Sequence, residues 1–366
     1  MEGLMRFLSL LLLSAALPVA AELRFEDLEA KRSDWATYRF PVLQGDSLAV
    51  RRINTFLHAM ELEGLPGRFE RSPFERIWPK DDEIWGTNSL DYRIDAEQPG
   101  FLSLTISGEY TGAYTSMGHV TYLFDLASGH PIGLSQLFTS AGLQRLGERI
   151  GRERSKRIED YLAGIPVPSG YGDEQVSLSP DDHDEYSDEQ RDMYRHCLPS
   201  HSAADLRYDR LQLGKQQLTL TAGGCAPHAA RALDDLGDFV NSVPYAELDA
   251  DLSTYGRCLL LERRSDCQHP GDLKAGGVYW GKIDGRYPIT LIVGTSENSR
   301  PQSSAYFYDK YATRIELDGR DLRDGRLRLQ EGGDTPARFD LQLRADGTLR
   351  GTWQQVGGKA LAVELQ

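Results

Sequence analysis

Residues 99–138 decide the fold of this chain and read PGFLSLTISGEYTGAYTSMGHVTYLFDLASGHPIGLSQLF. Leu102, Leu104 and Ile106 alternate with small polar residues, which is the two-residue period of a half-buried β-strand. A turn rich in glycine and serine follows. A second strand is predicted over residues 119–126, ending at the turn Ala127-Ser128-Gly129. The stretch therefore predicts two strands joined by a turn.

Three short motifs follow one another along the chain: Phe124-Asp125-Leu126 with Gly129, Leu134-Ser135-Gln136-Leu137-Phe138, and Pro244-Tyr245-Ala246-Glu247-Leu248. In this order they resemble a family of secreted bacterial domains, the RsiV/PdaC type, over residues 30–256. The segment Thr115-Ser116-Met117-Gly118-His119 stands where the family has a Gly-Gly-Ala-His turn. The resemblance implies an α+β fold outside the cytoplasm. It also makes lysozyme the leading ligand class, because the RsiV domain is a lysozyme receptor.

The N-terminus predicts export. Residues 7–21 form a leucine-rich apolar run that ends in Val19-Ala20-Ala21, the small-residue pattern of a signal-peptide cleavage site. This run of 15 residues is shorter than the roughly 20 that span a bilayer. We therefore expect residues 1–21 to be a signal peptide. The mature chain is expected to be periplasmic, of the Gram-negative type, with no membrane span.

The charge of the chain is unevenly distributed. From Gly276 to the end, 13 Lys and Arg residues stand against 12 Asp and Glu residues, a net charge of +1. Residues 1–21 hold one charge of each sign and contribute nothing. Because the whole chain has a net charge of −14, residues 22–275 have a net charge of −15. This argues against a nucleic-acid partner, because binding phosphates needs a basic face. A cationic protein is favoured, because complementary potentials speed encounter.

The order of predicted elements gives an α+β class for residues 22–257. A strand is predicted over residues 35–43, and Asp46 or Ser47 caps a helix with Leu48 and Met60 on its apolar face. A second helix is predicted over residues 140–162, and strands over residues 206–213 and 217–221. Together these elements predict an antiparallel sheet with packed helices.

Residues 163–205 form an acidic insertion in this plan. Residues 165–172 are a loop by composition, and a dense acidic patch follows. Ser187 with Gln190 three residues later predicts a capping box that starts a short helix. Insertions of this size are usually functional or disordered.

The chain changes character after a predicted linker, residues 258–275. Residues 276–366 contain short strands that alternate with turn dipeptides, which predicts an all-β antiparallel meander or small barrel. The dipeptides are Asp284-Gly285, Asp318-Gly319, Gly332-Gly333, Asp346-Gly347 and Gly357-Gly358. With Tyr279-Trp280-Gly281 and Gly351-Thr352-Trp353 as landmarks, this part resembles a C-terminal domain of other secreted bacterial proteins of unknown activity.

The four cysteines of an exported chain predict disulfides. Of the three possible pairings, sequence distance favours Cys258–Cys267, which leaves Cys197–Cys225. A zinc site is the alternative. Two cysteines and two histidines would supply tetrahedral ligands, in competition with oxidation outside the cytoplasm. The four residues are Cys197, His201, Cys225 and His228.

The sequence carries no motif of a known catalytic or cofactor site. It has no Gly-x-Ser-x-Gly, no His-Glu-x-x-His and no phosphate-binding glycine loop. The acidic patch lacks the register and the glycine of an EF-hand. We therefore predict that the chain is not an enzyme and takes no cofactor or metal.

The predicted function is a periplasmic, non-catalytic binding or inhibitor protein that recognises a cationic envelope-targeting protein such as lysozyme. One alternative is an immunity protein that neutralises a secreted antibacterial toxin. Another is a peptidoglycan- or envelope-binding structural protein. The predicted partner-binding residues are Ser169 and Tyr171, whose exposed loop suits insertion into a cleft, and the acidic residues Asp181, Asp182, Asp184 and Glu185.

Overall fold

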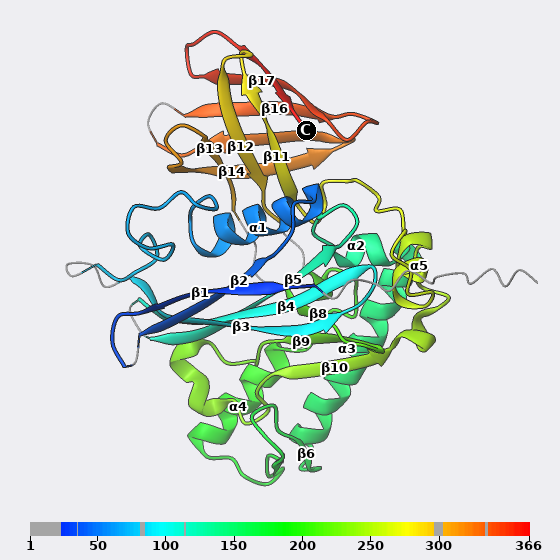
Figure 1. Cartoon of the computed structure of the whole chain (residues 1–366). Helices are drawn as coiled ribbons and strands as arrows, with labels where there is room; N and C mark the ends of the chain where they lie inside the picture. The colour runs from blue at the N-terminus through cyan, green and yellow to red at the C-terminus, as the bar shows by residue number, and fades with distance from the viewer. Residues whose placement is uncertain (1–22, 35, 81–84, 113–114, 296–302, 334–335) are drawn as a thin grey trace, which may run out of the picture.

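The computed structural model describes residues 23–34, 36–80, 85–112, 115–295, 303–333 and 336–366. The predicted signal peptide, residues 1–21, lies outside these ranges. Figure 1 shows the layers: an eight-stranded barrel, a helix, a five-stranded sheet, a three-stranded sheet and a helical lobe. The predicted fold class, an α+β part followed by an all-β antiparallel part, is confirmed.

The five-stranded sheet contains the strands in chain order: β1 (Phe25–Lys31), β2 (Thr37–Leu43), β3 (Gly86–Glu97), β4 (Phe101–Thr111) and β5 (Ser116–Asp125). All neighbours are antiparallel except β2 and β3, which are parallel. A parallel pair needs a long crossover, and helix α1 (Leu48–Glu61) provides it. The sheet is therefore mixed at this pair, unlike the wholly antiparallel sheet predicted.

Helix α1 joins the sheet to the barrel. The Ser47 hydroxyl accepts a hydrogen bond from the Val50 N–H at 3.1 Å and caps the helix, as predicted. Ile53, Phe56 and Leu57 are fully buried, whereas Leu48, predicted on the same face, is half exposed because it lies in the first turn. The apolar core around α1 continues into the barrel through Val278, Ile292 and Phe307.

The lower face of the sheet is also covered. Strands β8 (Arg210–Leu213), β9 (Gln217–Ala222) and β10 (Phe239–Pro244) form a small antiparallel sheet. The Leu213 N–H donates to Ser103 Oγ at 3.4 Å, and Gln212 Nε2 donates to Thr105 Oγ1 at 3.2 Å. Strand β4 is therefore buried on both faces, and the prediction of a half-buried strand is wrong. Its polar face packs against a second sheet.

Helix α3 (Ser140–Leu162) has the predicted bounds and packs on the small sheet through Leu146 and Ile150. Two short helices lie beside it, α2 (Leu134–Leu137) and α5 (Thr254–Leu260), with a 3-10 helix (Tyr245–Leu248) before α5. The strand predicted over residues 206–213 is only β8, because a 3-10 helix (Asp205–Tyr208) occupies its first half.

The insertion is structured. It contains the short hairpin β6 (Val167–Pro168) and β7 (Gln175–Val176) and helix α4 (Glu185–His196). The predicted capping box at Ser187 is misplaced by three residues, because Asp184 is the N-cap and its carboxylate accepts the Ser187 N–H at 2.8 Å. A 3-10 helix (His228–Leu233) lies between β9 and β10.

The C-terminal part is a closed antiparallel barrel with a hydrophobic interior. Asp284 and Gly285 have φ values of 54° and 64°, which fits the predicted two-residue hairpin turn. The turn predicted at Asp318-Gly319 is instead a bulge inside a strand. The strands are β11 (Gly277–Ile283), β12 (Tyr287–Val293), β13 (Ser304–Tyr308), β14 (Arg314–Arg323), β15 (Arg326–Glu331), β16 (Ala337–Leu343), β17 (Leu349–Gln355) and β18 (Leu361–Leu365).

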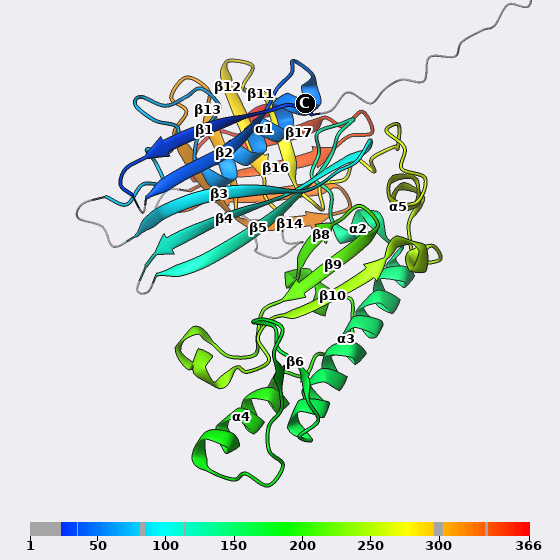
Figure 2. The ribbon, with the colours of Figure 1, turned by 60° about the horizontal axis from the view of Figure 1, so that its bottom comes forward.

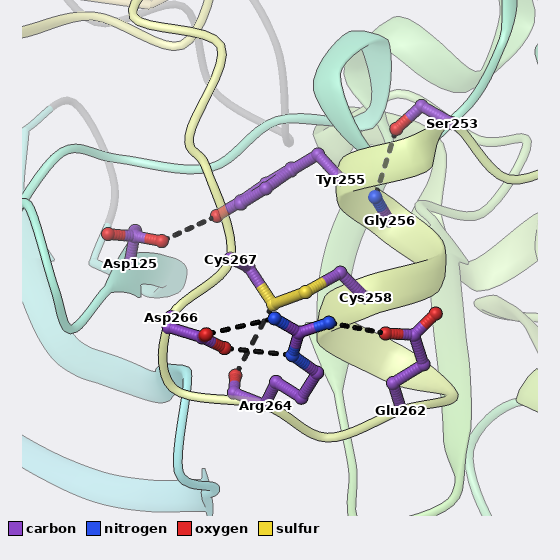
Figure 3. The surroundings of a disulfide bond; sticks show 9 residues. All are labelled: Asp125, Ser253, Tyr255, Gly256, Cys258, Glu262, Arg264, Asp266 and Cys267. Carbon is purple, nitrogen blue, oxygen red and sulfur yellow. Dashed lines mark hydrogen bonds and ion pairs between the residues drawn. A yellow bond between two sulfur atoms is a disulfide. The ribbon is translucent and has the colours of Figure 1, made fainter.

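The predicted linker, residues 258–275, packs against both parts. Cys258 and Cys267 form a disulfide at the end of α5 (Figure 3), and Cys267 lies in the core of the lower layers. Leu273 is buried in the barrel core. The change in charge and in turn spacing at this linker also predicts that residues 22–257 and 276–366 fold separately, and this stays a prediction. None of the helices in the described ranges has the length and apolar character to cross a bilayer.

Candidate functional site

The lower end of the molecule is a distal lobe, which we define as residues 157–205 and 223–239. Figure 2 shows this lobe projecting from the body of the fold. The predicted disulfide Cys197–Cys225 is present and joins the end of α4 to the segment after β9. The lobe has its own small core, made of Ile158, Tyr161, Val167, Leu178, Tyr194, Leu236 and Phe239. The insertion is therefore a packed unit and offers a defined surface.

The predicted loop around Tyr171 is fixed at its base. Ser169 Oγ donates to the Asp235 carbonyl at 3.1 Å, and the Gly170 N–H donates to the Leu236 carbonyl at 2.5 Å. A Cβ at Gly170 would lie 2.3 Å from the Asp238 carbonyl oxygen, so a side chain does not fit there. Tyr171 itself is 55% exposed. The loop therefore presents an aromatic ring on an ordered backbone.

The acidic patch lies at the start of α4. Asp181, Asp182 and Glu185 are exposed, and in the described ranges none of them forms an ion pair. Asp184 is exposed too, and the Ser187 backbone N–H lowers the pKa of its carboxyl group. Asp184 therefore has a structural role as the helix cap besides any role in binding.

Tyr186 extends this surface and was not predicted from the sequence. Its hydroxyl donates to the Ala232 carbonyl, and its side chain is about half exposed. The Tyr171 ring packs on Gly237, where a Cβ would lie 2.9 Å from the ring. Both tyrosines thus rest on the segment 231–237. The only sequence signal for Tyr186 is an aromatic residue in the first turn of an acidic helix.

The segment beneath the two tyrosines is held by buried hydrogen bonds. Tyr194 Oη donates to Asp234 Oδ1 at 3.0 Å, and Tyr161 Oη donates to Asp235 Oδ2 at 2.6 Å. Burial is the largest cause of the raised pKa of both tyrosines, so both hydroxyls stay protonated and keep donating. The arrangement makes the acidic and aromatic surface rigid before any partner binds.

The alternative zinc site is not assembled. Cys197 and Cys225 are joined in a disulfide and offer no thiolates. His201 Nε2 lies 2.6 Å from Ser155 Oγ, and the side chain of His228 lies outside the described structure. Over the described ranges, no group of three or more potential ligands is placed to hold a metal ion.

The motif residues that carry the family resemblance hold the fold together. Asp125 Oδ1 accepts hydrogen bonds from the N–H and the hydroxyl of Ser128, each at 2.7 Å. Its other oxygen accepts the Tyr255 hydroxyl at 2.9 Å (Figure 3). In the closing motif, Tyr245 Oη donates to the Gly214 carbonyl at 2.8 Å. These residues join the sheet to α5 and β10 to β8–β9, and they do not form a binding surface.

A groove of about 910 Å³ lies on the side of the five-stranded sheet that faces the barrel. It is bounded by the end of that sheet, by α1 and by the barrel. Sequence reasoning missed it, because its walls come from segments far apart in the chain. The aromatic residues Trp78, Trp85, Tyr110 and Tyr122 line it.

No family model matches the chain, and no curated protein matches it. Among solved structures, it is similar to a DUF3298 family protein of Bacteroides fragilis NCTC 9343, with a TM-score of 0.40 and 13% identity over 67% of this chain and 98% of that chain. It is also similar to a DUF3298 family protein of Pseudomonas aeruginosa PAO1, with a TM-score of 0.37 and 13% identity over 64% and 96%. The resemblance to the RsiV/PdaC type stays a prediction.

Proposed function

We propose that this chain is a periplasmic, non-catalytic binding protein whose distal lobe recognises a cationic envelope-targeting protein, with lysozyme as the first partner to test. The observation that carries the proposal is that the exposed rings of Tyr171 and Tyr186 contact one ordered segment, residues 231–237, and that Tyr186 lies in the first turn of the helix whose start carries the unneutralised acidic residues. Aromatic anchors beside complementary charge are typical of protein interfaces. Lysozyme is the first partner to test because residues 99–138 resemble the RsiV type.

Physical complementarity supports a cationic partner. Residues 22–275 carry a net charge of −15, and the lobe adds exposed carboxylates that no cation in the described structure neutralises. Charges at the rim of an interface act mainly on the association rate and are screened beyond about 8 Å at physiological salt. Because the lobe is ordered by its disulfide and buried hydrogen bonds, little conformational entropy is lost on binding.

Surface plasmon resonance with c-type, g-type and i-type lysozymes, at low and physiological salt, is the test. The variant D181N/D182N/D184N/E185Q should slow association, and Asn at position 184 keeps the helix cap. The matched control is E29Q/D46N/E70Q/D324N, which changes net charge equally at exposed positions outside the lobe. Tyr171→Ala should speed dissociation about 10-fold.

If the two quadruple variants slowed association equally, the net charge of the chain would be the cause, and the position of the acidic residues on the lobe would not matter. Absence of binding to all three lysozymes at low salt would reject lysozyme as the partner. Binding of a cationic antibacterial toxin with the same dependence on the lobe would instead make the chain an immunity protein.

A further inference from the structure

The groove between the sheet and the barrel forms where the sheet extends beyond its helix. Helix α1 covers β5 as far as Tyr122, whose ring packs edge-on against Phe56, and the helix ends at Glu61. The rest of β5, with the ends of β3 and β4, continues past the helix. Arg314 and Glu316 of β14 form the opposite wall. The result is an open groove of about 910 Å³ with the face of a sheet as its floor.

Two aromatic rings lie on glycines in this groove. The Tyr110 ring crosses the paired residues Gly108 and Gly118, where a Cβ would approach it to 2.9 Å and 2.8 Å. A Cβ at Gly112 would lie 2.6 Å from the Trp85 ring. Side chains at these three positions would therefore displace the rings. Each ring has backbone behind it, and Trp85 is 63% exposed. Trp85 is not an isolated exposed ring, because Trp78, Tyr110 and Tyr122 line the same groove.

Among the described residues that line the groove, the positive and negative side chains are equal in number. Glu61, Glu63 and Glu316 stand against Arg76, Lys80 and Arg314. Arg76 Nη1 donates to the Ala312 carbonyl at 2.6 Å, so part of this set also joins the barrel to the sheet.

Two hydrogen-bond donors in the groove walls have no acceptor in the described structure. The Nε1–H of Trp78 and the Nε–H of Arg314 are buried without a hydrogen-bond acceptor in the described part of the chain. An unsatisfied buried donor costs about 1–3 kcal/mol. Both donors are shielded from solvent, and Arg314 Nε lies 3.6 Å from Glu316 Oε1, so these groups belong to the wall itself and a ligand in the open groove does not reach them.

We propose that this groove binds a neutral oligosaccharide. The C–H face of a sugar ring packs on an aromatic ring, and its hydroxyls accept and donate hydrogen bonds. The fixed rings of Tyr110 and Trp85 and the mixed polar walls provide both. The volume is at the upper end of the range of roughly 300–1,000 Å³ of small-molecule sites, which gives room for more than one sugar ring.

Other ligand classes fit less well. An anionic ligand calls for a net positive wall, and the part of this wall that the structure describes has equal charges of both signs. A peptide that adds a strand needs a free sheet edge, whereas the floor here is a sheet face. This inference is independent of the proposed lobe function, because the groove lining contains none of the lobe residues.

Isothermal titration calorimetry with cellohexaose, chitohexaose and maltohexaose, on the full mature chain, tests the proposal. We expect at least one of them to bind, with quenching or enhancement of tryptophan fluorescence. Trp85→Ala and Tyr110→Leu should each weaken binding about 10-fold or more. Tyr208→Ala removes an exposed aromatic side chain outside the groove and should leave affinity unchanged.

The response to salt separates this site from the lobe. Binding of a neutral sugar should be the same at low and high salt, and the quadruple lobe variant should bind it as the wild type does. No heat and no fluorescence change with any of the three sugars at millimolar concentration would overturn the proposal. Unchanged affinity in both Trp85→Ala and Tyr110→Leu, with thermal unfolding showing that both are folded, would also overturn it.

Discussion

Two buried histidines should make the protein sensitive to mild acid. His58 in α1 is 5% exposed, and its Nδ1 lies 2.8 Å from the Asn54 carbonyl oxygen. Burial lowers its pKa to about 4. His130, which stacks on His269 with ring centres 5.4 Å apart, has its pKa lowered to about 3 by burial and by the nearby charge of Arg52. Both rings are therefore neutral in the folded protein at any pH above about 5.

The sign of the effect follows from proton binding. In the unfolded chain a histidine has a pKa of 6.5, so at about pH 5 it is protonated while folded His58 and His130 stay mostly neutral. The unfolded state then binds more protons, so stability falls as the pH drops below 6.5 and continues to fall towards the folded pKa. Each histidine lowers the free energy of unfolding by about 2 kcal/mol between about pH 7.5 and pH 5. Burial lowers the pKa of His269 as well, which acts in the same direction.

Urea unfolding of the wild type, His58→Leu and His130→Leu at about pH 7.5, 6.5 and 5 measures this. The wild type should lose about 4 kcal/mol or more over the range, and each variant should lose about 2 kcal/mol less than the wild type. The difference between pH values is the readout, because a leucine changes stability at every pH. A wild type equally stable at pH 7.5 and pH 5, or variants that lose as much as the wild type, would refute the reasoning.

Three further predictions concern bonds that hold the layers together. Replacing Cys258 and Cys267 by alanine frees a short loop in the unfolded chain and should lower the free energy of unfolding by about 3 kcal/mol in urea. Asp125→Ala leaves the buried Tyr255 hydroxyl without its acceptor and should cost about 1–3 kcal/mol, seen as a lower melting temperature. Arg154→Met removes the ion-pair partner of buried Asp209, 2.7 Å away, and should lower the free energy of unfolding by about 3–5 kcal/mol. Adding Asp209→Asn to this variant should recover part of the lost stability, and no recovery would show that the unpaired charge is not the cause.

The elements that could be predicted from the sequence are those specified locally. Helix α3 follows from a long apolar stripe, and its bounds match the prediction. Ser47 caps α1 because a hydroxyl directly before an apolar-periodic segment satisfies free backbone N–H groups. The turn at Asp284-Gly285 follows from the tolerance of both residues for positive φ. The disulfide pairing followed from short sequence distances.

What the sequence did not reveal depends on contacts between distant segments. Ser103 and Thr105 look like the solvent face of a strand, yet both are buried, because a sheet that begins about a hundred residues later covers them. The parallel pairing of β2 with β3 depends on where α1 returns the chain. In the candidate site, the acidic residues and Tyr171 could be named from composition. The contact of Tyr186 with the segment 231–237, on which Tyr171 also packs, could not be named in this way, because it joins parts of the chain that are distant in sequence.

The family resemblance and the two proposed binding surfaces occupy different residues, and this separation has a physical reason. Asp125 is 1% exposed, with both carboxylate oxygens used inside the fold, so a partner cannot reach it without breaking those bonds. Tyr171 and Trp85 are more than half exposed and rest on glycines, so substitution of either ring costs little stability. Recognition on such a scaffold can change while the motif residues stay fixed. The motifs therefore predict the scaffold, and the ligand must be found by testing the lobe and the groove separately, with salt as the variable that distinguishes charge from stacking.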